Sequence, residues 1–385
     1  MVVHLLVGTK KGAWLYTADE ARRTWTVSKP IMPGWTVSHL AADTRRTPVR
    51  LFAACHHWAW GQSVAWSDDG GDTWEQRSPG LAFPEDMGIS IGAMWHVAPG
   101  HASQPGVVWA GAQPAGLFKS EDWGESWKPV DGLNRHPYRE FWNGAGGAGD
   151  SCLHSIQIDP RDARRMYIAI STGGSYVSDD GGETWSLISH GIVATTQAAK
   201  DMMAQAIEMF PDFANPKVPE GVDPAALDEF HKLILDTKQP DRLWGQAHVG
   251  VFVSEKRGQG WDDVTEGLPS FHGFPLAVTR NHPDYVFVVP LEFERDNFRV
   301  CAGQFAVYRS GDGGKTWQGL TNGLPGPHDY QSAYREALDT DGETPEGVYV
   351  GTTNGEIFGS SNLGERWERL PGTLPPILSI TAASW

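Results

Sequence analysis

The chain has 385 residues, of which 40% are apolar, enough to fill a sizeable core. Its formal net charge of −16 argues against the broad basic surface that nucleic acids and anionic membranes require in a partner. No uninterrupted apolar run is long enough to span a bilayer, so we expect no membrane partner.

The cysteines and the first residues indicate a cellular compartment. Cys55, Cys152 and Cys301 are too few and too far apart for a disulfide framework. Residues 1–8 enter an apolar pattern directly, without the basic segment and cleavage site of a secretory signal. We therefore expect a cytoplasmic protein.

One short motif recurs seven times along the chain. The clear copies are residues 67–74 (SDDGGDTW), 120–127 (SEDWGESW), 178–185 (SDDGGETW) and 310–317 (SGDGGKTW), and the weaker ones are residues 17–25, 254–261 and 360–367. An Asp carboxylate can accept backbone N–H groups in a bend, and Gly supplies the positive φ that tight turns need. An alternating run precedes each copy, and a large apolar Trp closes it. Each copy therefore predicts a strand–turn–strand hairpin.

These residues resemble the Asp-box, or BNR, repeat of sialidase-like β-propellers, and the resemblance extends over almost the whole chain. Proteins with this arrangement are described as exo-α-sialidases or glycosyl hydrolases, which implies a carbohydrate substrate. The Arg-Ile-Pro signature of true sialidases is absent from this sequence. Seven-bladed xyloglucanases are similar in blade number, but they use two propellers in tandem and this chain has room for one.

The spacing of the motif predicts the architecture. Most closing tryptophans lie about 50 to 60 residues apart, close to the length of a propeller blade. In one unit, residues 153–159, 166–171, 175–178 and 185–188 read as four antiparallel strands. We predict an all-β fold, a single seven-bladed β-propeller formed by residues 1–385.

The two ends of the chain are expected to share a blade. Residues 1–30 supply only three strands of their unit, while residues 376–384 read as an inner strand without a blade. We expect this tail to complete the N-terminal blade and close the ring, which removes two exposed sheet edges.

The unit between Trp185 and Trp261 contains an insertion, placed at residues 190–225, with helical sequence expected near 193–230. Within it, Met203, Ile207 and Phe210 recur at helical spacing. We expect an amphipathic helix whose apolar stripe packs against the propeller.

Four histidines share one spacing. His39, His96, His154 and His231 each precede a large aromatic residue by thirteen positions, namely Phe52, Trp109, Tyr167 and Trp244. Four coincidences in one column of a blade would arise by chance on the order of one time in ten thousand. If the inner strands align on this frame, the imidazoles converge at the channel and suit a metal such as Zn, Mn, Fe or Cu. The alternative is that they hydrogen-bond the next blade and fill the channel.

Other polar and aromatic residues are expected at the same face. Tryptophans beside polar donors and carboxylates are typical of carbohydrate sites, although they could equally form a packed rim. The candidate substrate-binding residues are His56, His57, Trp58, Trp60, Trp142, Gln246 and His248. The candidate catalytic residues are Tyr334, Arg335, Glu336 and Asp150.

Three functions remain open from the sequence. The first is an enzyme with a histidine-lined, metal-dependent site at the channel mouth, acting on a small polar or carbohydrate-like molecule. The second is a metal-independent glycosyl hydrolase that uses carboxylates such as Glu336, Asp150 or Asp86. The third is a non-catalytic binding or assembly scaffold. The oligomeric state is open in each case.

Overall fold

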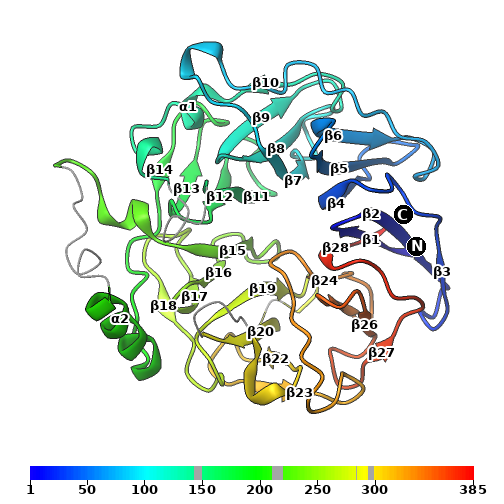
Figure 1. Ribbon diagram of the computed structural model, residues 1–385, viewed down its shortest axis with the longest axis vertical. Coiled ribbons are helices and arrows are strands. Elements are labelled where there is room, and N and C mark those ends of the chain that lie inside the picture. Colours follow the sequence, from blue (N-terminus) through cyan, green and yellow to red (C-terminus); the bar gives the residue numbers. More distant parts are fainter. Residues whose placement is uncertain (143–149, 210–219, 283, 294–298) are drawn as a thin grey trace.

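The computed structural model describes residues 1–142, 150–209, 220–282, 284–293 and 299–385. Their strands form seven sheets arranged around a central channel (Figure 1). This confirms the predicted seven-bladed β-propeller. No helix in the described part of the chain is both long enough and apolar enough to cross a membrane.

The first four blades follow the chain from the N-terminus, except that the innermost strand of the first one comes from the C-terminus. From the channel outward, the first blade has β28 (Ile377–Ser384), β1 (Val3–Thr9), β2 (Gly12–Ala18) and β3 (Trp25–Val27); the second has β4 (Thr36–Asp43), β5 (Arg50–His57) and β6 (Gly61–Ser67); the third has β7 (Ala93–Pro99), β8 (Val108–Gln113), β9 (Gly116–Ser120) and β10 (Lys128–Pro129); the fourth has β11 (Leu153–Ile158), β12 (Met166–Ile170), β13 (Ser175–Ser178) and β14 (Ser186–Leu187).

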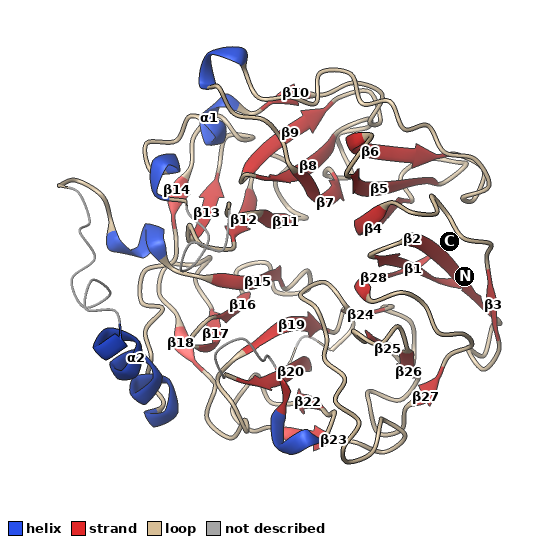
Figure 2. Cartoon of the chain, viewed as in Figure 1, coloured by secondary structure: helices blue, strands red, loops and turns tan. Residues whose placement is uncertain are grey.

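The remaining three blades repeat the same order. The fifth has β15 (Phe230–Leu235), β16 (Leu243–Ala247), β17 (Gly250–Ser254) and β18 (Asp262–Asp263); the sixth has β19 (Gly273–Val278), β20 (Val286–Glu292), β22 (Val307–Ser310) and β23 (Gln318–Leu320), with β21 (Arg299–Val300) beside β20; the seventh has β24 (Leu338–Thr340), β25 (Val348–Gly351), β26 (Ile357–Ser360) and β27 (Glu368–Arg369). Figure 2 shows these sheets radiating from the channel.

The C-terminal strand closes the ring as predicted. β28 pairs antiparallel with β1 along its whole length, and the backbone N–H of Val2 donates to the carbonyl of Trp385 at 3.2 Å. Ile377 and Ile380 of β28 are buried in the core between the first and seventh blades. The blade is therefore made from the two ends of the chain.

The repeated motif forms a tight turn between the outer strands. In the copy at residues 178–185, the buried Ser178 hydroxyl donates to Asp180 and accepts the N–H of Gly182 at 2.8 Å. The Asp180 carboxylate accepts the N–H of Thr184, and the indole of the buried Trp185 donates to the Gly182 carbonyl. Gly181 and Gly182 both have positive φ. The motif is therefore structural, because its polar groups satisfy the turn and its Trp packs between blades.

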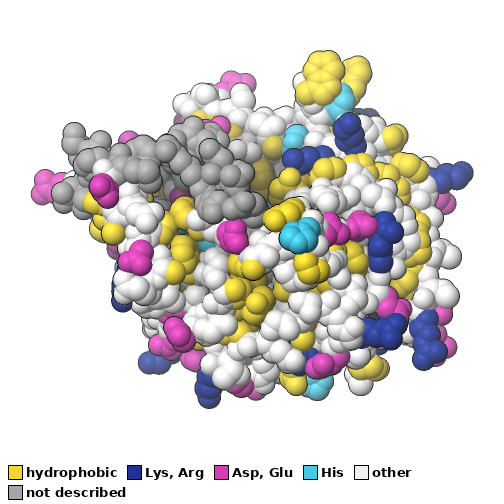
Figure 3. Space-filling view, turned by 60° about the horizontal axis from the view of Figure 1, so that its bottom comes forward, with side chains coloured by type: hydrophobic (Ala, Val, Ile, Leu, Met, Phe, Trp, Pro, Cys, Tyr) yellow, Lys and Arg dark blue, Asp and Glu magenta, His cyan; other side chains and the backbone are white. Residues whose placement is uncertain are grey.

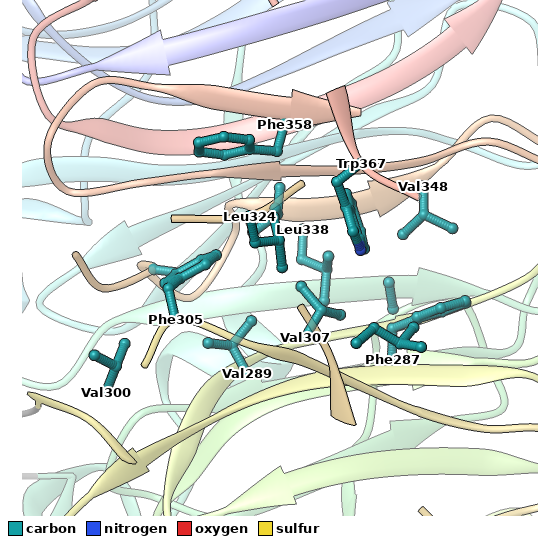
Figure 4. Packing of buried hydrophobic residues seen from close by; sticks show 14 of the residues in the cluster. Phe287, Val289, Val300, Phe305, Val307, Leu324, Leu338, Val348, Phe358 and Trp367 are labelled. Carbon is teal, nitrogen blue, oxygen red and sulfur yellow. The ribbon is translucent and has the colours of Figure 1, made fainter. Parts of the chain in front are cut away.

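The core lies between neighbouring blades. In the interface of the sixth and seventh blades, Phe287 and Phe305 pack against Leu338, Phe358 and Trp367 (Figure 4). Since each sheet is covered on both faces by its neighbours, its strands read as nearly continuous apolar runs.

Helices are few and lie outside the sheets. α2 (Gln197–Met209) lies at the periphery of the ring, inside the predicted insertion. The shorter ones are α1 (Asp131–Asn134) and the 3₁₀ turns η1 (Glu85–Met87), η2 (Arg139–Phe141), η5 (Pro224–Leu227) and η6 (Cys301–Gly303).

The predicted packing of α2 is only partly correct. Ala199 is buried, but Met203 is exposed and Ile207 is half-buried. The side turned to the protein is therefore rotated away from the predicted Met203 stripe. Phe210, the last member of that stripe, lies outside the described residues.

Candidate functional site

The inner strands of the second to fifth blades each carry a β-bulge near their start, which changes the position of the histidines. In the second and third blades the unpaired residues are Ser38 and Trp95, and the following His39 and His96 are paired with the neighbouring strand. In the fourth and fifth blades the unpaired residues are His154 and His231 themselves. A bulge changes the direction in which a side chain points, so His154 and His231 do not point in the same direction as His39 and His96.

The predicted single histidine column is therefore wrong. Ser155 and Lys232 are the residues equivalent to His39 and His96. The thirteen-residue count failed because the pairing of the first two strands differs between blades. In the fourth blade Gln157 pairs with Tyr167, and these residues are one position closer in sequence than Ala41 and Phe52, which pair in the second blade. A shift of one residue moves a side chain to the other face of a strand.

His154 bonds to the next blade, as in the alternative interpretation. Its ring is fully buried, with Nε2 2.8 Å from the carbonyl oxygen of Phe230 and Nδ1 3.0 Å from the hydroxyl of Ser155. Burial, followed by the nearby Arg335 charge, lowers the pKa of His154 well below its usual value. Both ring nitrogens have protein partners, so the predicted metal role is not supported for His154.

A first polar group lies inside the channel. The rings of His39 and His96 stack with their centres 3.9 Å apart, and His96 Nδ1 is 4.0 Å from Glu336 Oε2. The same carboxylate oxygen contacts the ammonium of Lys232. Burial lowers the pKa of both histidines well below the usual value, helped by the facing His96 for His39 and by Lys232 for His96. The group is thus a neutral histidine pair beside a buried ion pair.

This group lines a cavity of about 680 Å³. Its lining also includes residues that follow the ends of the inner strands, such as Thr44, Asp236 and Arg280. The cavity therefore opens at the face where the inner strands end.

A second polar group lies at the start of the inner strands. The ring centre of His231 is 5.5 Å from that of His248 and 5.0 Å from that of His272. Glu229 Oε2 is 2.8 Å from His248 Nδ1 and 4.0 Å from His231 Nε2. Burial lowers the pKa of His231 to about 4 and that of His272 to about 2. Burial would raise the pKa of Glu229, but the adjacent His231 and His248 outweigh this effect and lower it.

The predicted aromatic loop is the turn between β5 and β6, on the face where the inner strands begin. Trp58 and Trp60 are 94% and 76% exposed, the largest exposed fractions of any described tryptophan. The His57 ring lies beside both, and the neighbouring His56 is half-buried. Figure 3 shows one face of the ring where hydrophobic and histidine side chains reach the surface among scattered charges.

Two other predicted substrate contacts are buried in the protein. The Trp142 indole donates to the Tyr176 hydroxyl at 3.1 Å, and the Gln246 amide donates to the carbonyl of Ala247 at 2.9 Å. Their exposed fractions are only 7% and 2%. Their predicted contact with substrate is therefore not supported, because both satisfy the protein's own polar groups.

The predicted catalytic residues do not form one cluster. Arg335 donates to Cys152 Sγ at 3.5 Å and lies near the face of Trp95, while Tyr334 lies under the Lys10 ammonium. Asp150 is exposed, and its carbonyl accepts the amide of Gln113. Of the four, only Glu336 lies in the channel group.

Sequence reasoning missed Lys232, Asp228 and Glu229, and did not commit to His272. Burial, with a smaller contribution from Asp223, raises the pKa of Asp228 to about 8. The available signal was two adjacent acids directly before a predicted inner strand that begins Phe-His-Lys.

Comparison with known proteins found no protein-family model that matches this sequence. The chain is 24% identical over 331 residues to an oligoxyloglucan-reducing end-specific xyloglucanase of Emericella nidulans, covering 80% of this chain and 38% of that protein. It is 26% identical over 358 residues to a probable enzyme of the same description from Neosartorya fischeri, covering 88% and 39%. The chain thus spans about two fifths of the length of these relatives.

A solved structure supports the fold. The Niastella koreensis GH74 enzyme superposes with a TM-score of 0.59 over 96% of this chain and 55% of that one, at 16% sequence identity. At that identity the likeness concerns the propeller alone.

Proposed function

We propose that this chain is a glycosyl hydrolase that binds carbohydrate on the face where the inner strands begin. The observation that carries the proposal is the exposure of Trp58 and Trp60 at the β5–β6 turn. Two large aromatic rings exposed next to one another form a patch of the kind that marks a binding site, and the apolar face of a sugar ring stacks well on such rings.

The relatives support a carbohydrate substrate. Both are described as xyloglucanases, and the alignments cover most of this chain. Because each relative is more than twice as long as the matched part, the activity of the whole enzyme comes to this chain only as a proposal. A branched glucan oligosaccharide is the substrate class that we infer.

Hydrolysis of a glycosidic bond needs one protonated carboxyl group and one carboxylate. Asp228 suits the role of general acid, because a pKa of about 8 keeps it protonated at neutral pH. Asp150 suits the role of carboxylate base or nucleophile. Both acids lie next to the segment Thr172–Gly173. The hydroxyl of Ser151, which follows Asp150, donates to the carbonyl of Thr172, and the N–H of Gly173 donates to the carbonyl of Asp228.

Glu336 is less suited to this chemistry. Its carboxylate contacts the Lys232 ammonium and is only 6% exposed. A general acid or base must exchange a proton with substrate or water, which a buried ion pair hinders.

The test is release of reducing ends from xyloglucan oligosaccharides, measured together with binding of the same oligosaccharides. We expect Trp58→Ala combined with Trp60→Ala to weaken binding, and Asp228→Asn and Asp150→Asn to lower turnover by about 10²–10⁴-fold while binding persists. Glu183→Gln, an exposed acid in a blade-outer turn, is the matched control and should behave like the parent. Binding without turnover in the parent would instead favour a binding protein, and absence of both would overturn the proposal.

A further inference from the structure

Three histidines from two neighbouring blades face a common point at the channel mouth. His231 lies in β15, His248 in the turn between β16 and β17, and His272 directly before β19. Their ring centres form a nearly equilateral triangle with sides of 5.0, 5.0 and 5.5 Å. The rings are almost mutually perpendicular, at 77° to 83°. One candidate ligand atom from each lies within 4.8 Å of the others.

This triangle has the size of a tetrahedral metal site. A ligand nitrogen lies about 2.0–2.1 Å from zinc, which places each imidazole centre about 3.2 Å from the ion. At the tetrahedral angle, neighbouring ring centres then lie about 5.2 Å apart. The observed sides bracket this value without any movement of the backbone.

Polar contacts of the three rings orient them for metal binding. His231 Nδ1 is 2.6 Å from the carbonyl oxygen of Gly273, and His272 Nδ1 is 3.4 Å from that of His248. A carbonyl oxygen can only accept, so Nδ1 carries the proton and the neutral ring has its lone pair on Nε2. His248 Nδ1 faces the Glu229 carboxylate at 2.8 Å. Metal-binding histidines are typically held in this way, by a carbonyl or carboxylate on the second nitrogen.

The surroundings of the triangle are largely apolar, with the Glu229 carboxylate on one side and the Arg335 guanidinium over Phe274. Phe274 stacks on His231, and Phe293 packs edge-on against His248 and His272, so apolar rings limit competition from water. Glu229 supplies one negative charge, and its ion pairs among the described residues are with His248 and His231. His248 is about a quarter exposed, which gives an ion a route inward.

The channel group offers an internal contrast. His39, His96 and Glu336 also come within 4.8 Å of one another, but Lys232 already places an ammonium on the carboxylate. A second cation would have to displace it, so metal binding is disfavoured there.

We propose that His231, His248 and His272 bind one late first-row divalent cation of the zinc type, with Glu229 holding His248 in position. Three neutral imidazoles suit such an ion, and three protein ligands leave a fourth position for water or a ligand oxygen. The site stands on its own geometry and does not depend on the proposed hydrolase activity.

The experiment is a titration of the full chain, purified without a histidine tag and stripped with a chelator, with Zn²⁺ alone by calorimetry. A parallel titration with Co²⁺ reports the coordination through its visible absorption, and circular dichroism checks the folding of each variant. We expect one equivalent of metal per chain. His248→Ala should bind at least tenfold more weakly; the conservative Glu229→Gln, which keeps the side-chain shape, should weaken binding by about ten- to a hundredfold.

Two histidine variants serve as matched controls. His57→Ala removes a half-buried histidine on the same face, outside the triangle, and His96→Ala removes one from the channel group. Both should keep the parent's affinity and its Co²⁺ spectrum. The proposal is overturned if the parent binds less than one equivalent, if His248→Ala binds as tightly as the parent, or if binding is lost with His96 instead.

Discussion

The ammonium of Lys232 contacts the carboxylate of Glu336 inside the channel, and this contact joins the fifth blade to the start of the seventh. The two side chains are 9% and 5% exposed, so the ion pair is screened little by water. It is a contact between two blades that are not neighbours, since the sixth blade lies between them.

Breaking this ion pair should be more harmful than removing it. Glu336→Gln leaves a buried ammonium without its countercharge, and we expect the free energy of unfolding to fall by about 3–5 kcal/mol. Lys232→Met combined with Glu336→Gln should recover much of that loss, because no buried charge remains. Urea unfolding of the single and double variants measures the difference, and equal losses in both would contradict the role of the charge.

The turn motif should stabilise through its buried serine. Ser178→Ala leaves the N–H of Gly182 without its acceptor, at an expected cost of about 1–3 kcal/mol. Asp179→Ala in the same turn removes an exposed ion pair with Arg165 and should cost under about 1 kcal/mol. Thermal unfolding of the two variants is the measurement. A larger effect from Asp179 would mean that the surface charge, rather than the turn, holds the motif.

Asp228 should make stability fall as pH rises. An ordinary Asp in the unfolded chain loses its proton near pH 3.8, whereas folded Asp228 keeps it to about pH 8. Between these values the unfolded state binds fewer protons, so this residue lowers stability by up to about 1.4 kcal/mol per pH unit. Asp228→Asn should therefore gain stability relative to the parent as pH rises from 4 to 8. A difference between the two that is independent of pH would contradict the raised pKa.

Loss of β28 should open the ring. Deleting residues 376–385 removes the buried Ile377 and Ile380 and exposes the edge of β1. We expect the truncated chain to aggregate or to lose its cooperative unfolding transition. Ile380→Ala in the full chain should cost about 2–5 kcal/mol and keep a single transition. A truncated chain that melts like the parent would show that closure is dispensable.

The repeat made the fold predictable, whereas the site depended on details that repeats do not encode. Seven copies of one turn fix the number of blades, because each copy forces one hairpin and packs one Trp at least partly into the core. The position of His154 was mispredicted for two reasons. The connection between the paired residues of β11 and β12 is one residue shorter than its counterpart in the second blade, and a bulge in β11 changes which residue points into the channel. Spacing alone does not reveal either feature.

Contacts between blades could not be predicted from the sequence either. Lys232 and Glu336 lie 104 positions apart, and no pattern in either segment indicates that they meet. The triangle of His231, His248 and His272 takes one residue each from an inner strand, a turn and a connection between blades. The three share no spacing within the repeat, so only the assembled ring brings them together.

The pairing of Val2 with Trp385 has a consequence for how the protein folds. During synthesis, β1, β2 and β3 emerge before the strands of the other six blades, but the strand that covers β1 emerges only after them. Until then β1 presents an unpaired edge, to which β28 or the edge of another chain can add. Contacts of such long sequence separation form slowly, so we expect closure of the first blade to limit the folding rate and chaperones that shield strand edges to raise the yield.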